Sequence, residues 1–298
     1  MEGKIFKGAI ACLMLGLSGL SNAGFITYTS TGGADFFEVP YGVSEIRVLA
    51  IGGGAGGANG HQGGGGAGYL STGIFSVNAF DAFSVVVGEG GTGAASGSNM
   101  IVGLTGGETS SFGSLLTSLG GGAVTGINQG GHNGSSGGGA ACNSGSLGGS
   151  GGSSGSNGQS CQSGDSMPFG FGQGDYTSLL SIFTESVFSA GAGGAGGTGS
   201  HAGGGGAGGI LIDGLGISAS DGLMSWSGKG GIGYGAGGGA GGLDFSVSDI
   251  RFAGGDGADG LVYVEWDSPA VSVSEPSAFL IMSLGLAGLA FRKKSKNA

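Results

Sequence analysis

The chain has 298 residues, of which 81 are Gly and only 4 are Pro, and its formal net charge is −10. Hydrophobic residues make up 39% and Phe alone contributes 16, a composition too apolar for a solvated linker. Collagen is excluded because Gly occurs in runs rather than at every third position, and Pro is scarce.

The N-terminus has the three parts of a secretory signal peptide. Lys4 and Lys7 precede an apolar run of 13 residues, 8–20, and small residues follow it. Signal peptidase reads small residues at such a position, so we predict cleavage between Ala23 and Gly24. An N-terminal membrane anchor is disfavoured because a spanning helix needs about 20 apolar residues.

A second apolar run, 278–291, is followed directly by a basic cluster. This order is typical of a stop-transfer segment, whose basic end stays in the cytoplasm. At 14 residues the run is short for a bilayer, so flanking side chains would have to snorkel or the bilayer would have to thin. A buried core helix is the alternative. We expect a short transmembrane span.

The residues around this run resemble a known sorting signal. A tripeptide motif precedes the apolar run and a basic tail follows it; the residues are Ser274, Glu275, Pro276, Arg292, Lys293 and Lys294. They are similar to the PEP-CTERM signal of Gram-negative bacteria, with Ser in place of the first Pro. The resemblance implies transient anchoring in the inner membrane, cleavage by an exosortase, and cells that export extracellular polysaccharide.

Removing both signals makes the chain more acidic. Residues 24–274 contain three basic residues against 17 Asp and Glu, a net charge of −14; the basic residues are Arg47, Lys229 and Arg251. Neutralising phosphates requires clustered Lys and Arg. Nucleic acid is therefore excluded as a partner.

Residues with high strand propensity gather near both ends of the mature region. We predict hairpins from 25–29 with 35–39, and from 69–77 with 83–87, together with single strands at 45–51 and 261–266. One segment differs, because 177–189 places Leu179, Leu180, Phe183 and Val187 on one helical face. It predicts a short helix.

Four Gly tracts lie between the strands; they are 52–68, 120–158, 191–209 and 228–242. Gly loses more conformational entropy on ordering than any other residue, so an isolated tract would stay disordered. Polyproline-II helices offer an ordered solution, since they leave each N–H and C=O pointing sideways toward a neighbouring helix. The predicted fold is therefore mainly β, with a small antiparallel framework that holds packed polyproline-II-like tracts.

Several apolar segments resemble a widespread bacterial glycine-rich domain. They are 37–54, 63–69, the strand ending at 86–91, 109–113 and 257–264. Related regions occur in anaplastic lymphoma kinase receptors and, more loosely, in phage tail-tip adhesins. The resemblance spans 36–266 and implies an extracellular architecture rather than one activity. We assign 1–23 to the signal peptide, 24–267 to the glycine-rich β domain and 268–298 to the sorting signal.

Cys142 and Cys161 are the cysteines that remain after signal cleavage. In an oxidising compartment we expect them to form a disulfide. It would close a loop of 20 residues and stabilise the fold by roughly 3 kcal/mol in the chain-entropy model. Two free thiols are the alternative.

No motif predicts a metal, a cofactor or a catalytic centre. The three His residues lack zinc-ligand spacing; they are His61, His132 and His201. One Gly-Gly-x-Gly-x-Asp match at 254–259 resembles a calcium-binding nonapeptide, but such repeats act in tandem. No nucleophile stands beside a His base, and a catalytic site needs rigid side chains that Gly tracts lack. We expect no enzyme activity.

Two functions are compatible with this sequence. The first is an exported structural protein of the cell surface or extracellular matrix, associated with polysaccharide. The second is an adhesin or recognition module that binds glycan or protein through loops such as 159–171, with Pro168, Phe169 and Phe171, or Trp226 near Lys229. Exposed aromatic rings would favour recognition, and buried rings would favour a structural role.

Overall fold

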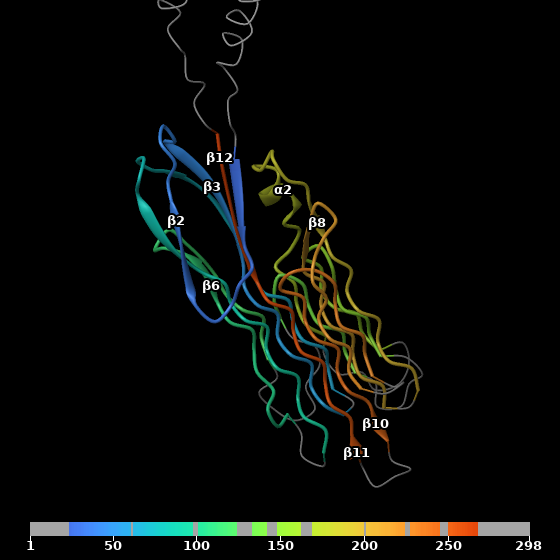
Figure 1. Ribbon diagram of the computed structural model, residues 1–298. Coiled ribbons are helices and arrows are strands. Elements are labelled where there is room, and N and C mark those ends of the chain that lie inside the picture. Colours follow the sequence, from blue (N-terminus) through green and yellow to red (C-terminus); the bar gives the residue numbers. More distant parts are fainter. Residues whose placement is uncertain are drawn as a thin grey trace, which may run out of the picture. The chain divides into compact units, whose positions relative to one another are not determined.

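The computed structural model describes residues 24–60, 62–97, 101–123, 133–141, 148–161, 169–199, 201–223, 227–244 and 250–267. Gly24–Trp266 forms one compact unit. The unit is mainly β, as predicted, and its described residues include one short helix, α2 (Thr177–Leu180). Gly tracts extend from its strands as an array of roughly parallel segments (Figure 1).

Two antiparallel four-stranded sheets form the framework. The first has the order β1 (Gly24–Tyr28), β12 (Leu261–Trp266), β3 (Glu45–Ile51), β4 (Leu70–Ser76). The second has the order β2 (Ala34–Glu38), β5 (Ala82–Val86), β6 (Ser110–Phe112), β7 (Leu116–Ser118). Two small antiparallel pairs complete the described strands, β8 (Phe188–Ala190) with β9 (Ile210–Ile212) and β10 (Leu243–Asp244) with β11 (Ile250–Arg251).

A hydrophobic core joins the two four-stranded sheets. Alternate residues of β3 and β12, including Ile46, Val48 and Val264, share one buried cluster with Val85 of β5 and Phe112 of β6. Successive side chains of a strand point to opposite faces, so this cluster uses only one face of the first sheet. The two sheets therefore pack face to face as a sandwich.

The opposite face of the first sheet is buried as well. Leu49 of β3 and Tyr263 of β12 pack in a second cluster with Leu180 of α2, Phe183 and Ile210 of β9. Strands buried on both faces read as continuous apolar runs rather than as alternating ones. This explains why every residue of 261–265 is buried.

Both predicted hairpins are wrong, although the strands themselves exist. β1 pairs with β12 and β2 pairs with β5, so the turn at Gly32 and Gly33 leads from one sheet into the other. β4 pairs with β3, and the next strand, β5, again lies in the opposite sheet. Turn residues look the same in a hairpin and in a connection between two sheets. Which strands pair is decided by the burial of side chains between the facing sheets, which the local sequence does not show.

The predicted helix is shorter than the pattern suggested. α2 ends at Leu180, and Phe188 already belongs to β8. A longer helix would use the N–H groups of Thr184 and Glu185 for its own ladder. Both groups instead donate to the buried carboxylate of Glu265, so a tertiary contact ends the helical turn.

Hydrogen bonds between the Gly tracts repeat every three residues. In 52–58 the backbone N–H groups donate to three other segments, one of which is the second half of the same Gly tract, and residues three apart donate to the same segment. The donors Gly52, Ala55 and Ala58 reach carbonyls in 63–69, Gly53 and Gly56 reach those in 105–108, and Gly54 and Gly57 reach those in 255–258. Three residues per turn is the period of a polyproline-II helix. The tract therefore has the conformation expected from the sequence.

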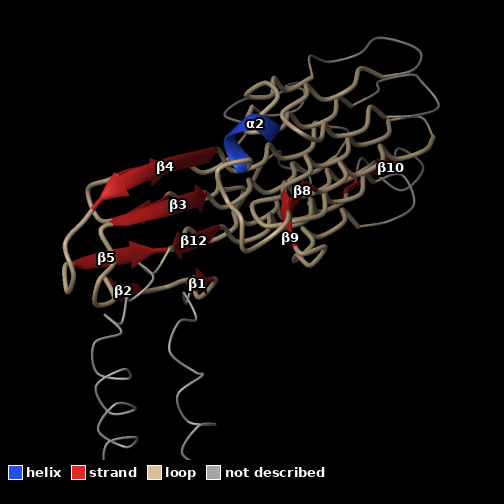
Figure 2. Ribbon diagram, turned by 90° about the horizontal axis from the view of Figure 1, so that it is seen from above, coloured by secondary structure: helices blue, strands red, loops and turns tan. Residues whose placement is uncertain are grey.

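The carbonyls of the same tract accept from further tracts. The Gly53 carbonyl accepts from the Gly121 N–H. The carbonyls of Gly54 and Gly57 accept from Gly91 and Ala94, respectively, and those of Ala55 and Ala58 accept from Gly238 and Gly241. The 52–58 tract is thus hydrogen-bonded on all sides, within the array that Figure 2 shows beside the sheets. A Cβ atom added at Gly53, Gly54 or Gly57 would lie closer than 3.0 Å to a neighbouring carbonyl oxygen. Close approach without Cβ atoms makes this bonding possible.

Candidate functional site

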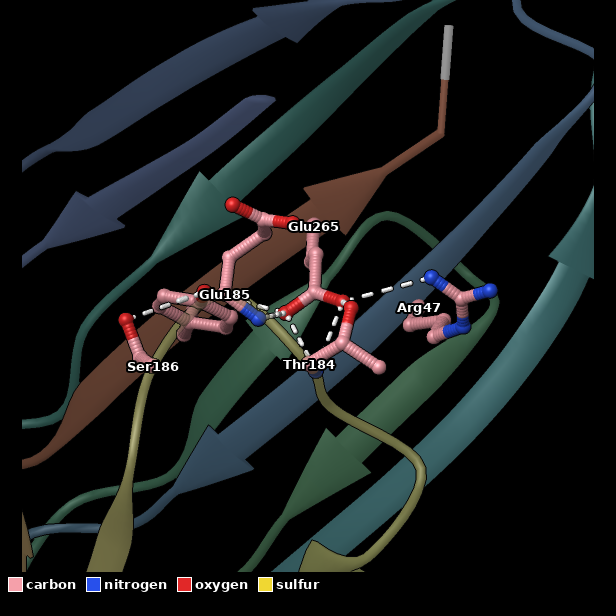
Figure 3. Close-up of polar contacts among 6 residues, drawn as sticks. Arg47, Thr184, Glu185, Ser186 and Glu265 are labelled. Atoms are coloured by element: carbon pink, nitrogen blue, oxygen red, sulfur yellow. Dashed lines mark hydrogen bonds and ion pairs between the residues drawn. The ribbon is translucent and has the colours of Figure 1, made fainter. Parts of the chain in front are cut away.

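A buried carboxylate lies at the junction between the first sheet and the segment that follows α2. Glu265 of β12 has no exposed surface and stands directly opposite Arg47 of β3. Arg47 Nη1 lies 3.2 Å from Glu265 Oε1, and the Arg47 side chain is 17% exposed. Figure 3 shows the carboxylate between this cation and the 184–186 segment.

Five donor groups surround this carboxylate. The Thr184 N–H lies 2.9 Å from Oε1, the Thr184 hydroxyl donates to Oε1 at 2.9 Å, and the Glu185 N–H donates to Oε2 at 3.1 Å. The Tyr263 hydroxyl donates to Oε2 at 3.1 Å, and Arg47 supplies the remaining donor. A buried charge is tolerated when it is paired and hydrogen-bonded in this way. The arrangement fastens the 184–186 segment to the sheet.

Tyr263 completes the cluster. Burial raises the pKa of its hydroxyl well above the ordinary value; the hydrogen bond with Ser186 lowers it, and the nearby Glu265 raises it again. The rings of Phe183 and Phe188 meet the Tyr263 ring edge-on, with centroids 5.5 and 5.1 Å away. The hydroxyl therefore stays protonated and holds the carboxylate rather than exchanging protons with it.

At the surface of the array, Asp carboxylates take the place of backbone carbonyls as acceptors for two Gly N–H groups. Asp259 Oδ1 accepts from the Gly90 N–H at 2.8 Å, and Asp256 Oδ1 accepts from the Gly93 N–H at 2.7 Å. The two Asp residues are three positions apart and so are the two Gly residues, so the spacing of the carboxylates matches one turn of the adjacent segment. The calcium-like match at 254–259 thus has a structural use, with its Asp side chains bonded to backbone amides.

Two exposed aromatic rings meet where two turns, each connecting one sheet to the other, lie together. Tyr41, between β2 and β3, is 82% exposed, and Phe80, between β4 and β5, is 64% exposed. Their ring centroids are 6.2 Å apart and the rings are inclined by 33°. This pair could not be predicted from the sequence, because the two residues are 39 positions apart and meet only through tertiary folding.

The loops selected from the sequence are described only in part. Pro168 and Trp226 lie outside the described residues. Phe171 is 59% exposed and its ring lies 5.7 Å from that of Phe169, which is half-buried. Lys229 forms a surface ion pair with Asp221 at 2.8 Å. The structure therefore leaves at least one aromatic ring of these loops open to solvent.

The remaining predicted site residues fall mostly outside the described part. Gly24 begins β1, whereas Ala23, Cys142 and the sorting residues in 274–294 are not described. Cys161 is half-buried, and its disulfide with Cys142 stays a prediction. Among described residues no group of three or more His, Cys, Asp or Glu side chains is placed to hold a metal ion. Within that same part, no helix is long and apolar enough to cross a membrane.

Two family models match this chain, and none of the curated proteins does. The PEP-CTERM protein-sorting motif matches residues 272–294, which confirms the resemblance found at the C-terminus. The protein is thus exported and is processed by an exosortase-type sorting enzyme. The glycine-rich domain model matches residues 29–267, the region that contains every described strand except β1 and all the tracts described above. With most of its length in that match, the chain belongs to the glycine-rich domain family.

Proposed function

We propose that the chain is a non-enzymatic structural protein of the cell surface or extracellular matrix of a Gram-negative bacterium, where it associates with exported polysaccharide. The observation that supports this proposal is the three-residue period of hydrogen bonds between Gly tracts. That bonding converts a Gly-rich chain into a packed body, which is what a structural element outside the cell requires. The exosortase motif supports the location.

The most deeply buried charged cluster also favours a structural role. Glu265 accepts from five donors, and its partners come from the sheet and from the 184–186 segment. A general base needs a free lone pair within reach of a substrate proton. Here the carboxylate is engaged by the protein itself, so its role is to hold elements together.

Fractionation of the producing cells tests this proposal. Processed protein should begin at Gly24, should lack residues 279–298 in intact-mass spectra, and should co-purify with extracellular polysaccharide. Cells without the exosortase should instead retain an unprocessed form in the membrane fraction. Processed protein that stays entirely in the polysaccharide-free supernatant would contradict the association.

A recognition module is the second candidate, favoured by the exposed rings of Tyr41, Phe80 and Phe171. Aromatic side chains in loops on a rigid scaffold are a common means of binding a ligand. Binding of the purified protein to glycan arrays separates the two candidates. A recognition module would bind glycans other than the polysaccharide exported by its own cell, whereas a structural protein of the matrix would bind that polymer alone.

A further inference from the structure

Two β-turns bring the exposed rings of Tyr41 and Phe80 together. The Val43 N–H donates to the Pro40 carbonyl at 3.2 Å, and Gly42 in the third position of that turn has φ of 82°. The second turn is closed by the Asp81 N–H, which donates to the Asn78 carbonyl at 3.1 Å. Its third position, which in such turns is normally Gly, is occupied by Phe80.

Phe80 adopts a backbone conformation that is unfavourable for a bulky residue. Its φ is 70°, in the left-handed region that Gly adopts freely and L side chains rarely do. Burial does not compensate, because 64% of Phe80 remains exposed. Strain that packing does not explain is characteristic of functional positions. A large ring retained at this position therefore points to a role outside the fold itself.

Backbone hydrogen bonds hold the two turns rigidly against each other. The Phe80 N–H donates to the Val39 carbonyl and the Val39 N–H donates to the Asp81 carbonyl, both at 2.8 Å. The Asp81 carboxylate accepts from the Asn78 N–H, also at 2.8 Å. Val39 is completely buried in the sandwich core. The rings thus project from an anchored base and need little further ordering when they bind a ligand.

The negative charge of the protein favours a ligand without negative charge. Glu38 and Glu45, on the strands that flank the first turn, are exposed carboxylates, and the mature chain carries a net charge of −14. This surface repels phosphate headgroups, nucleic acids and acidic glycans. Exposed rings on an acidic protein suit a neutral sugar, which offers C–H groups to the ring faces and hydroxyls to the carboxylates of the flanking strands.

We propose that Tyr41 and Phe80 form a binding platform for neutral polysaccharide. This inference rests on the proposed function, since it names the site through which the protein would associate with the exported polymer. The rings supply apolar contact, and the exposed carboxylates of Glu38 and Glu45 accept hydrogen bonds from sugar hydroxyls.

A binding assay tests the proposal. It measures the affinity of the mature protein for the neutral fraction of the extracellular polysaccharide from the producing cells. Tyr41→Ser and Phe80→Gly should each weaken binding about tenfold, since each removes one ring contact. Phe80→Tyr keeps a ring at this position and should retain most of the affinity. Leu215→Ser is the matched control, because Leu215 is 73% exposed and follows β9, which belongs to neither four-stranded sheet.

The outcomes separate the site from the broader function. If the unmutated protein binds the neutral fraction and the ring variants bind equally well, the platform is refuted and the association stands. If the unmutated protein co-purifies with the polysaccharide but does not bind its neutral fraction, the platform fails and the proposed function stands. If it binds neither, both fail. Equal ring-dependent binding to phosphatidylcholine vesicles would indicate a lipid-binding loop instead. Ring-dependent self-association in sedimentation would indicate a contact with a second copy, and either result would overturn the proposal.

Discussion

At the scale of single residues, the tracts are governed by the space available for one Cβ atom. Ala55 and Ala58 are completely buried within their tract and lie three residues apart, hence on one side of a three-residue helix. A Cβ atom at Gly57 would point in another direction, toward the carbonyl oxygen of Gly239. The choice between Gly and Ala is therefore set by which side of the tract faces a neighbouring backbone.

Gly57→Ala should lower the free energy of unfolding by about 3 kcal/mol, the upper part of the usual range for overpacking. The added methyl group would overlap the Gly239 carbonyl, and the backbone can relieve that overlap only by separating two hydrogen-bonded tracts. Urea denaturation measures the loss. Gly33→Ala is the control, since a Cβ at that exposed turn meets nothing within 4 Å. Equal effects of the two substitutions would show that the close packing is not limiting.

Phe80→Gly should raise the free energy of unfolding, by about 0.5 kcal/mol. Relief of the left-handed conformation is worth roughly 1–2 kcal/mol, and the greater freedom of Gly in the unfolded chain offsets about 0.5–1 kcal/mol of it. Ala79→Gly, in the same turn, has no positive φ to relieve and should lower the stability. A destabilised Phe80→Gly protein would mean that the ring serves the fold, contrary to the argument for a binding role.

At the scale of elements, the Glu265 cluster attaches the 184–186 segment to the first sheet. Glu265→Ala should lower the free energy of unfolding by about 3–5 kcal/mol, the usual effect of breaking a buried pair from one side. It would remove the acceptor that the Thr184 and Glu185 amides share with Arg47.

Arg47→Met is the informative comparison for this cluster, because it keeps four of the five donors to Glu265. It should destabilise less than Glu265→Ala in the same urea titration. Hydrogen exchange should show the largest increase at 184–186 in both variants. A uniform increase across the sandwich, with no excess at that segment, would contradict the attachment role.

Alkaline pH should reveal the contribution of Tyr263. Its pKa is raised in the folded state, so its contribution to stability is intact below the unfolded value of about 10 and is lost as pH rises through the folded value. The unfolding free energy should therefore fall above about pH 10. Tyr263→Phe should make this slope shallower by up to about 1.4 kcal/mol per pH unit. An unchanged slope would show that Tyr263 ionises equally in both states.

At the scale of the whole molecule, the longer strands were predictable, whereas the short strands β6 to β11 and the pairing of the strands were not. Runs such as 45–51 and 261–266 became β3 and β12 with the predicted bounds, since β-branched and apolar residues signal strands locally. The two hairpins failed because pairing across facing sheets depends on tertiary burial. The Glu265 cluster could not be foreseen for the same reason, as its donors come from positions 47, 184, 185 and 263.

The sandwich and the tracts should lose their structure together. The same strands lead into the tracts: Gly52 follows β3 directly, Gly260 precedes β12 directly, and the 52–58 tract bonds to residues 255–258. We expect neither part to be stable alone. The Gly tracts have almost no side chains to bury, and the strands of the sandwich continue directly into the tracts. Val48, completely buried in the core between the sheets, is the position at which to test this coupling.

Val48→Asp would place an unpaired charge in that core and should destabilise it by several kcal/mol. Hydrogen exchange with mass spectrometry on the mature protein measures the result. In the unmutated protein, amides of 204–209 should be protected, since they donate to residues 62–65, 149–152 and 229–232. In the variant, protection should vanish in that tract as well as in β3. Thr27→Asp, which adds the same charge at an exposed strand position, should leave both protected. Random-coil exchange of 204–209 in the unmutated protein would reduce the tracts to linkers and remove the physical basis of the structural role.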